Sequence, residues 1–135
     1  MASVRCSYSV IAEHIVEMLL EAEDYAYRSV TVSDFVAIRR VGIQPKFHPD
    51  IRELLGANPR VIWFSDSYSE CRGYNDQLTV RFPFPEDAVL VNDAEREFIC
   101  FAPIPALSVE AEIDQTGEWV PIRKATIRQN MVVKR

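Results

Sequence analysis

The pattern of apolar and polar positions divides the chain into an early part with helical spacing and a later part with strand spacing. Residues 9–24 carry apolar side chains at helical intervals along one face, while Glu13, Glu17 and Glu21 repeat every fourth residue on the other. This amphipathic pattern predicts a helix that begins at a capping serine. A short strand of alternating character is expected before it, over residues 4–10.

A strand over residues 25–30 and a second helix are expected next. Thr31, with Asp34 three residues later, is typical of a capping box in which aspartate replaces the usual glutamate. Gly42 favours a left-handed residue at the helix end, and Pro45 prevents the helix from continuing. These signals together predict a second helix that starts at Thr31 or Ser33 and ends at about residue 41.

The stretch 60–67, Arg-Val-Ile-Trp-Phe-Ser-Asp-Ser, is the segment around which the other elements are expected to arrange themselves. Its four consecutive apolar residues, 61–64, include β-branched and aromatic side chains and are bounded by proline and polar residues. Such a short run predicts a strand that is buried on both faces. A short helix over residues 49–55 is expected just before it.

The remainder of the chain shows strand spacing. A polar loop is expected over residues 67–77, and residues 114–117 predict a hairpin loop. The tail from 125 to 135 is either a final strand or a frayed end, and residues 89–91 are expected to be buried. The expected strands are residues 78–82, 89–91, 98–101, 109–113 and 119–122.

Helices that come early and a run of short strands that comes late predict an α+β fold. We expect the early helices to pack on a mainly antiparallel sheet, in one domain that spans residues 1–135. A length of 135 residues, with 48% apolar residues, suits one domain with one core. A doubly wound nucleotide-binding fold is disfavoured because it would need helices between the later strands.

Charge and cysteine content narrow the classes of function. Twenty Asp and Glu residues against fifteen Lys and Arg give a net charge of -5, which disfavours non-specific nucleic-acid binding but leaves room for a local basic cleft. Three widely spaced cysteines without a CxxC pair predict reduced thiols in a cytoplasmic protein. Neither a signal peptide nor an apolar run of membrane-spanning length is recognisable, so we expect no membrane partner.

Common catalytic signatures are missing from the sequence. It contains no GxxxxGK[ST], GxGxxG, HExxH or GxSxG motif. Two histidines and three scattered cysteines lack the spacing of a zinc site, so no metal is expected. His14, close to an apolar stripe, is typical of a hydrogen-bonded boundary residue. His48 is interpreted as a loop or capping residue, with a ligand contact as the alternative.

The remaining polar candidates occur in an ordered set of short motifs. In sequence order, these are Tyr27-Arg28-Ser29, Gly42-Ile43-Gln44-Pro45, Val61-Ile62-Trp63-Phe64-Ser65, Glu97-Phe98-Ile99-Cys100-Phe101 and Ile104-Pro105. This set resembles small ADP-ribosyltransferase-like proteins, above all the branch that includes the RNA 2′-phosphotransferases and the DNA-targeting ADP-ribosyltransferase toxins. The resemblance covers about residues 25–113, through short and degenerate motifs.

The resemblance implies an ADP-ribosyltransferase-like fold, with NAD as co-substrate and no metal. The chain would transfer ADP-ribose to a macromolecular target, either protein or nucleic acid. The resemblance implies that Glu97 is catalytic and stabilises the positive charge that develops on the ribose as nicotinamide leaves. It also implies cofactor binding by Tyr27, Arg28, Ser65 and Tyr68, with the Arg28 guanidinium on the phosphates and the Tyr68 ring on nicotinamide.

Several alternatives stay open at the level of sequence. Glu95, Glu110 and Glu112 also qualify as the late acidic residue, although the last two alternate with apolar residues as on a solvated strand face. The alternative function is a non-catalytic acidic binding or inhibitor protein, such as a phage- or plasmid-type factor or an immunity protein. A common cleft for Arg28, Ser65 and Glu97 would favour the transferase. The oligomeric state is left open.

Overall fold

The computed structural model describes residues 25–68, 78–114 and 116–134. The strand expected over residues 4–10, the helix over 9–24 with His14, and most of the loop over 67–77 lie outside these described residues. The strands are β1 (Tyr25–Val30), β2 (Ile62–Ser65), β3 (Leu78–Pro83), β4 (Val89–Asn92), β5 (Glu97–Cys100), β6 (Glu110–Glu112), β7 (Trp119–Pro121), β8 (Ala125–Arg128) and β9 (Met131–Lys134). The helices are α2 (Val32–Val41), α3 (Ile51–Leu55) and the 3₁₀ helices η2 (Ala106–Ser108) and η3 (Ile122–Lys124).

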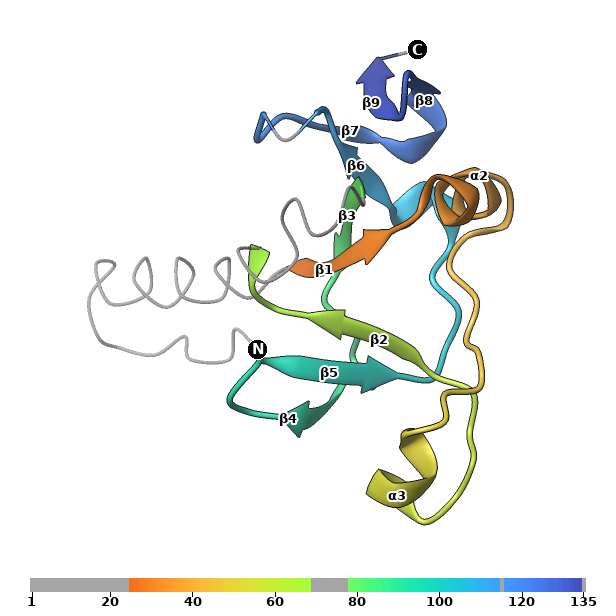
Figure 1. Ribbon diagram of the computed structural model, residues 1–135, viewed down its shortest axis with the longest axis vertical. Coiled ribbons are helices and arrows are strands. Elements are labelled where there is room, and N and C mark those ends of the chain that lie inside the picture. The colour runs from red at the N-terminus through yellow and green to blue at the C-terminus, as the bar shows by residue number, and fades with distance from the viewer. Residues whose placement is uncertain (1–24, 69–77, 115, 135) are drawn as a thin grey trace, which may run out of the picture.

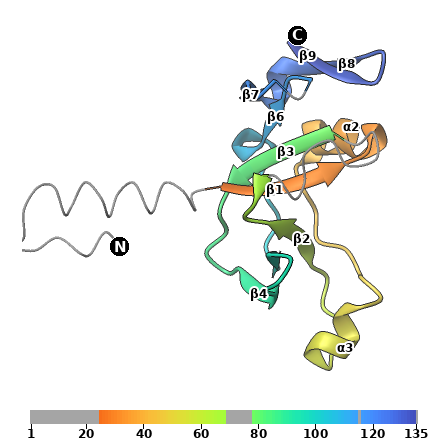
Figure 2. The same cartoon turned by 60° about the vertical axis from the view of Figure 1, so that its left-hand side comes forward.

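Seven of the described strands form one sheet in the order β4-β5-β2-β1-β3-β6-β7. Every neighbouring pair in this sheet is antiparallel. The strands β8 and β9 form a separate two-stranded hairpin beyond β7, whereas α3 lies at the other end of the molecule (Figures 1 and 2). The predicted α+β class with a mainly antiparallel sheet of short strands is therefore confirmed.

Helix α2 begins and ends where the sequence predicts. The backbone N–H of Asp34 donates to Thr31 Oγ1 at 3.1 Å, and the Thr31 N–H reaches Asp34 Oδ2 at 3.5 Å, which completes the capping box. The helix ends at Gly42, whose φ of 79° favours glycine. Phe35 and Ile38 are the buried residues of this helix.

The two faces of the sheet are covered differently. Successive strand residues point to opposite faces, so the core residues of the sheet separate into two clusters. The larger cluster packs against α2, and its sheet members are Ala26, Val30, Ile62, Phe64, Val80, Phe82, Phe98, Cys100 and Ala111. The smaller cluster lies on the opposite face and joins Ile51 of α3 to Val61 and Ile99, with Trp63 and Val91 packed against it.

Two burial predictions are wrong in part. The central strand β2 buries Ile62 and Phe64, but Trp63 on the opposite face is only half-buried because the small second cluster does not cover it fully. Strand β4, expected to be buried, is an edge strand that leaves Val89 and Leu90 about two-fifths exposed, at 40% and 43%. A short apolar run does not reveal whether its strand is central or at an edge.

The C-terminal tail forms the hairpin β8–β9. Its turn places Gln129 and Asn130 at φ values of 53° and 61°. Two consecutive positive φ values are typical of a type I′ turn, whose twist matches that of the flanking strands. The structure therefore decides between the two alternatives for the tail in favour of a paired strand.

Candidate functional site

Three of the predicted site residues lie side by side on adjacent strands. Tyr27 of β1 is opposite Ser65 of β2, and Ser65 is opposite Glu97 of β5. Residues directly opposite each other in antiparallel strands share one face of the sheet. At a strand spacing of about 4.8 Å, this site row of Tyr27, Ser65 and Glu97 spans about 10 Å.

Arg28 lies on the other face of the sheet, because it follows Tyr27 directly along β1. Its Nη1 donates a hydrogen bond of 2.5 Å to the backbone oxygen of Trp63. The register between β1 and β2 contains the single pair Tyr27 and Ser65, so the two strands part on the Arg28 side. Arg28 and the site row therefore do not line one common cleft on the same face of the sheet.

Arg28 reaches a pocket of about 170 Å³ that it shares with Lys46, His48 and Trp63. The segment that carries Lys46 is held beside β2 by paired backbone hydrogen bonds between Lys46 and Val61, at 2.9 and 2.8 Å. The His48 ring packs on the Trp63 ring, with centroids 5.0 Å apart. A ligand bound in this pocket would contact His48, as the alternative prediction for His48 requires. Lys46 was not predicted from the sequence.

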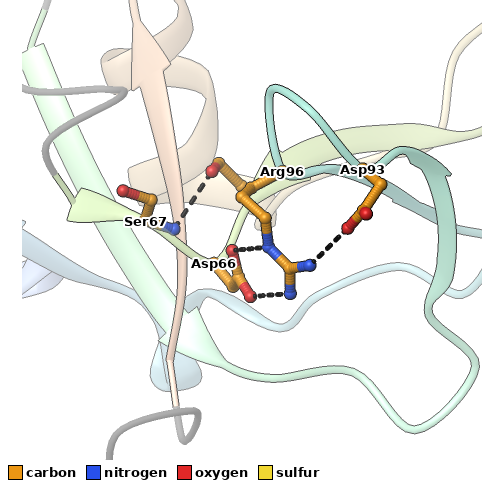
Figure 3. A network of polar contacts seen from close by, with 5 residues as sticks. Asp66, Ser67, Asp93 and Arg96 are labelled. Carbon is orange, nitrogen blue, oxygen red and sulfur yellow. Dashed lines mark hydrogen bonds and ion pairs between the residues drawn. The ribbon is translucent and has the colours of Figure 1, made fainter.

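The residues that flank the site row are fixed by an ion pair. Arg96 donates from Nη2 to Asp66 Oδ2 at 2.5 Å and from Nε to Asp66 Oδ1 at 3.1 Å (Figure 3). Arg96 also donates from Nη1 to Asp93 Oδ1 at 2.9 Å. The hydrogen bond to Asp66, more than any other contact, raises the pKa of the Arg96 guanidinium further above its usual range. This bidentate pair continues the β2–β5 ladder one residue beyond Ser65 and Glu97.

Glu97 follows the β4–β5 turn, and one oxygen of its carboxylate accepts a hydrogen bond from a residue that precedes this turn. Asn92 Nδ2 donates to Glu97 Oε1 at 3.1 Å, while Asn92 Oδ1 accepts the backbone N–H of Glu95 at 3.2 Å. Glu97 is half-buried in the site row, and Glu95 is exposed in the turn. Of the two neighbouring acidic candidates, Glu97 is therefore the one beside Ser65.

Tyr68 lies beside the site row. The centroid of its ring is 5.7 Å from that of the Tyr27 ring and 5.9 Å from that of the Trp119 ring. Its hydroxyl donates to the Glu112 carboxyl group, which also accepts the Gly117 N–H at 2.9 Å. Glu112 is only 2% exposed. The expectation of a solvated face is therefore wrong for Glu112, because the strand β7 and the Tyr68 ring cover it.

Glu110, the other late acidic candidate, is engaged by Arg81. The distance from Arg81 Nε to Glu110 Oε1 is 2.7 Å. The Arg81 guanidinium also lies over the Tyr25 and Trp119 rings, 4.0 and 4.4 Å from their centroids. This arrangement fills the surface between β1 and β7 and leaves Glu110 in a structural ion pair.

Cys100 is unsuited to act as a nucleophile. It lies on β5 with no exposed surface. Burial is the main cause that raises the pKa of its thiol to about 12, and Asp87 adds to this shift while Arg28 opposes it. A thiol that stays protonated near neutral pH is a poor nucleophile.

The described part of the chain holds no group of three or more His, Cys, Asp or Glu side chains placed to bind a metal ion. Among its helices, none is long and apolar enough to cross a membrane. No protein-family model matches the chain, and the comparisons with curated proteins and with solved structures gave no match either.

Proposed function

We propose that the protein is an NAD-dependent transferase of the ADP-ribosyltransferase type that moves ADP-ribose from NAD to a macromolecular target. The observation that carries this proposal is the site row, which unites Tyr27, Ser65 and Glu97 on one face although they come from distant parts of the sequence. Tyr68, another of the implied residues, packs against Tyr27.

The residues present suit the parts of NAD. The Arg28 guanidinium and the Lys46 ammonium border one pocket, and two cations there suit a diphosphate. The aromatic faces of Tyr27 and Tyr68 suit the nicotinamide ring. In the reaction the bond between the ribose carbon and nicotinamide nitrogen breaks, its electron pair leaves with nicotinamide, and a nucleophile of the target forms the new bond and loses its proton. The Glu97 carboxylate would stabilise the positive charge on the ribose carbon.

The placement of Arg28 favours a second candidate, a non-catalytic binding or inhibitor protein. Arg28 and Glu97 lie on opposite faces of the sheet. A single NAD molecule would have to meet both of them where β1 and β2 part. A decayed site with no turnover is the simpler explanation if NAD does not bind there.

The test is nicotinamide release from NAD by the purified protein, with Glu97→Gln and Glu95→Gln compared. We expect Glu97→Gln to lower release by a factor of about 100 or more, because the amide no longer stabilises the developing charge. Glu95→Gln, in the same turn but exposed, should behave like wild type. Equal release by wild type and Glu97→Gln would remove Glu97 from the mechanism.

Calorimetric titration with NAD separates the two candidates when release is low. Binding that Arg28→Gln weakens, together with release that depends on Glu97, supports the transferase. Neither binding nor release, with the target supplied as a cell extract, would favour the second candidate.

A further inference from the structure

A groove of about 460 Å³ lies between α2 and η3, apart from the site row. Its lining consists of Val36, Arg39 and Arg40 from α2 and Arg123 from η3. Among the residues that the structure describes, no acidic side chain takes part in this lining. In Figure 1, α2 lies near β1, β3 and β6, whereas α3 lies toward the opposite end of the molecule. We call these residues the arginine groove.

The charge of the groove is opposite to that of the whole chain. The net charge is -5, yet three guanidinium groups border this one hollow. Arg40 and Arg123 are exposed to solvent, as is the adjacent Lys124. Like charges gathered in this way repel one another, and a bound anionic group relieves the repulsion. The planar fork of arginine pairs with carboxylates in a bidentate manner.

Exposed apolar side chains are found in the groove itself and on the neighbouring helix η2. Val36, which lines the groove, is 59% exposed. The 3₁₀ helices η2 and η3 both pack against α2 and against each other. Leu107 of η2 is 80% exposed, the highest value among the exposed large hydrophobic residues of the described chain.

We propose that the arginine groove docks a protein partner through an acidic amphipathic helix. The partner's carboxylates pair with Arg40 and Arg123, and its apolar side chains cover Val36 and Leu107. Arginine combined with exposed apolar residues is typical of protein interfaces, whereas binding to a phosphate backbone requires no exposed valine or leucine. This surface is separate from the site row and does not depend on the proposed transfer.

The test uses a labelled synthetic helical peptide of about 16 residues, with leucine on one face and glutamate beside it. Its binding to the full chain is followed by fluorescence anisotropy at about 0.15 M salt. We expect Arg40→Glu and Arg123→Glu each to weaken binding by a factor of about 10 or more, since each replaces an ion pair with a repulsion. Arg52→Glu, at an exposed position of α3, is the matched control and should leave binding unchanged.

Two further measurements test whether the exposed apolar residues contribute to binding and whether the partner must be acidic. Leu107→Asp should weaken the binding of the glutamate peptide. A peptide with lysine in place of glutamate should not bind. Melting curves establish that each variant is folded. The proposal is overturned if the glutamate peptide does not bind, if the groove variants bind it as wild type does, or if a single-stranded oligonucleotide of equal charge binds more tightly.

Discussion

At the scale of single residues, the described part of the face that carries the site row holds two buried oxygen atoms without a hydrogen-bond partner. They are Thr79 Oγ1 and Glu112 Oε1. Because Val80 of β3 is opposite Ala111 of β6, the same register places Thr79 opposite Glu112. An unsatisfied buried polar atom costs about 1–3 kcal/mol, so this face is less stable than an apolar one would be.

Thr79→Val is therefore expected to leave the free energy of unfolding unchanged or to raise it by up to about 1 kcal/mol. The valine keeps the shape of the side chain and removes the unsatisfied hydroxyl. Thr31→Val is the matched control, because Thr31 caps α2 and its loss should cost about 1 kcal/mol. Urea unfolding measures both, and a clear loss of stability in Thr79→Val would show that its hydroxyl has a partner.

Cys100 makes the stability of the folded protein depend on pH in the alkaline range. The pKa of its thiol is about 12 in the folded chain and about 8.5 in an unfolded one. The folded state thus keeps a proton that the unfolded state releases. From this group, the free energy of unfolding falls by about 1.4 kcal/mol for each pH unit between these two values.

Cys100→Ala isolates this contribution from other groups that titrate at alkaline pH. Its own substitution cost is independent of pH, so the stability advantage of wild type over Cys100→Ala should shrink as the pH rises from about 8 to 11. Chemical denaturation at several pH values measures the difference. An advantage that stays constant would mean that the thiol titrates normally in the folded protein.

At the scale of elements, the end of α2 depends on Gly42, which lies close to the backbone of Ile104. A Cβ atom added at Gly42 would lie 2.2 Å from the backbone oxygen of Ile104. The two segments are tied there by backbone hydrogen bonds between Ile43 and Ile104, at 2.9 and 3.0 Å. This contact also closes one side of the larger core cluster, to which Ile43 and Ile104 belong.

Gly42→Ala is expected to lower the free energy of unfolding by about 3 kcal/mol or more, through the positive φ and the clash with Ile104 together. Gly56→Ala is the matched control: its φ is 71°, but nothing lies within 4 Å of an added Cβ atom. That variant should cost only about 1 kcal/mol. Similar losses in the two variants would mean that the backbone at Ile104 moves aside.

At the scale of the whole molecule, the two faces of the sheet support different amounts of core. The larger cluster with α2 includes Phe82, which has no exposed surface. The smaller cluster with α3 includes Ile51 and leaves Trp63 half-buried. Most of the stability should come from the first cluster, while the opposite face is left for the site row.

Phe82→Ala is accordingly expected to cost about 3–5 kcal/mol. Trp63→Ala should cost clearly less, since Trp63 is only half-buried and packs against the smaller cluster and His48. Thermal or urea unfolding of the two variants gives the comparison. An equal or larger loss for Trp63→Ala would show that the second cluster is the principal core.

Local signals in the sequence determined several elements correctly. Of the two predicted starts of α2, Thr31 with Asp34 is the one found, Gly42 marked the helix end, and alternation predicted strands where β3 and β6 are found. These signals act between residues a few positions apart, so they need no knowledge of the fold. The order of helices and strands then sufficed to predict an antiparallel α+β architecture.

Only the tertiary structure decided which side chains meet. Tyr27, Ser65 and Glu97 align because β2 pairs with both β1 and β5, a choice made by long-range packing. The burial of Glu112 likewise depends on β7 and Tyr68, since alternation along β6 alone could not distinguish solvent from protein cover. Strand neighbours and the cover of each face depend on contacts between distant segments, and these contacts have no local sequence pattern.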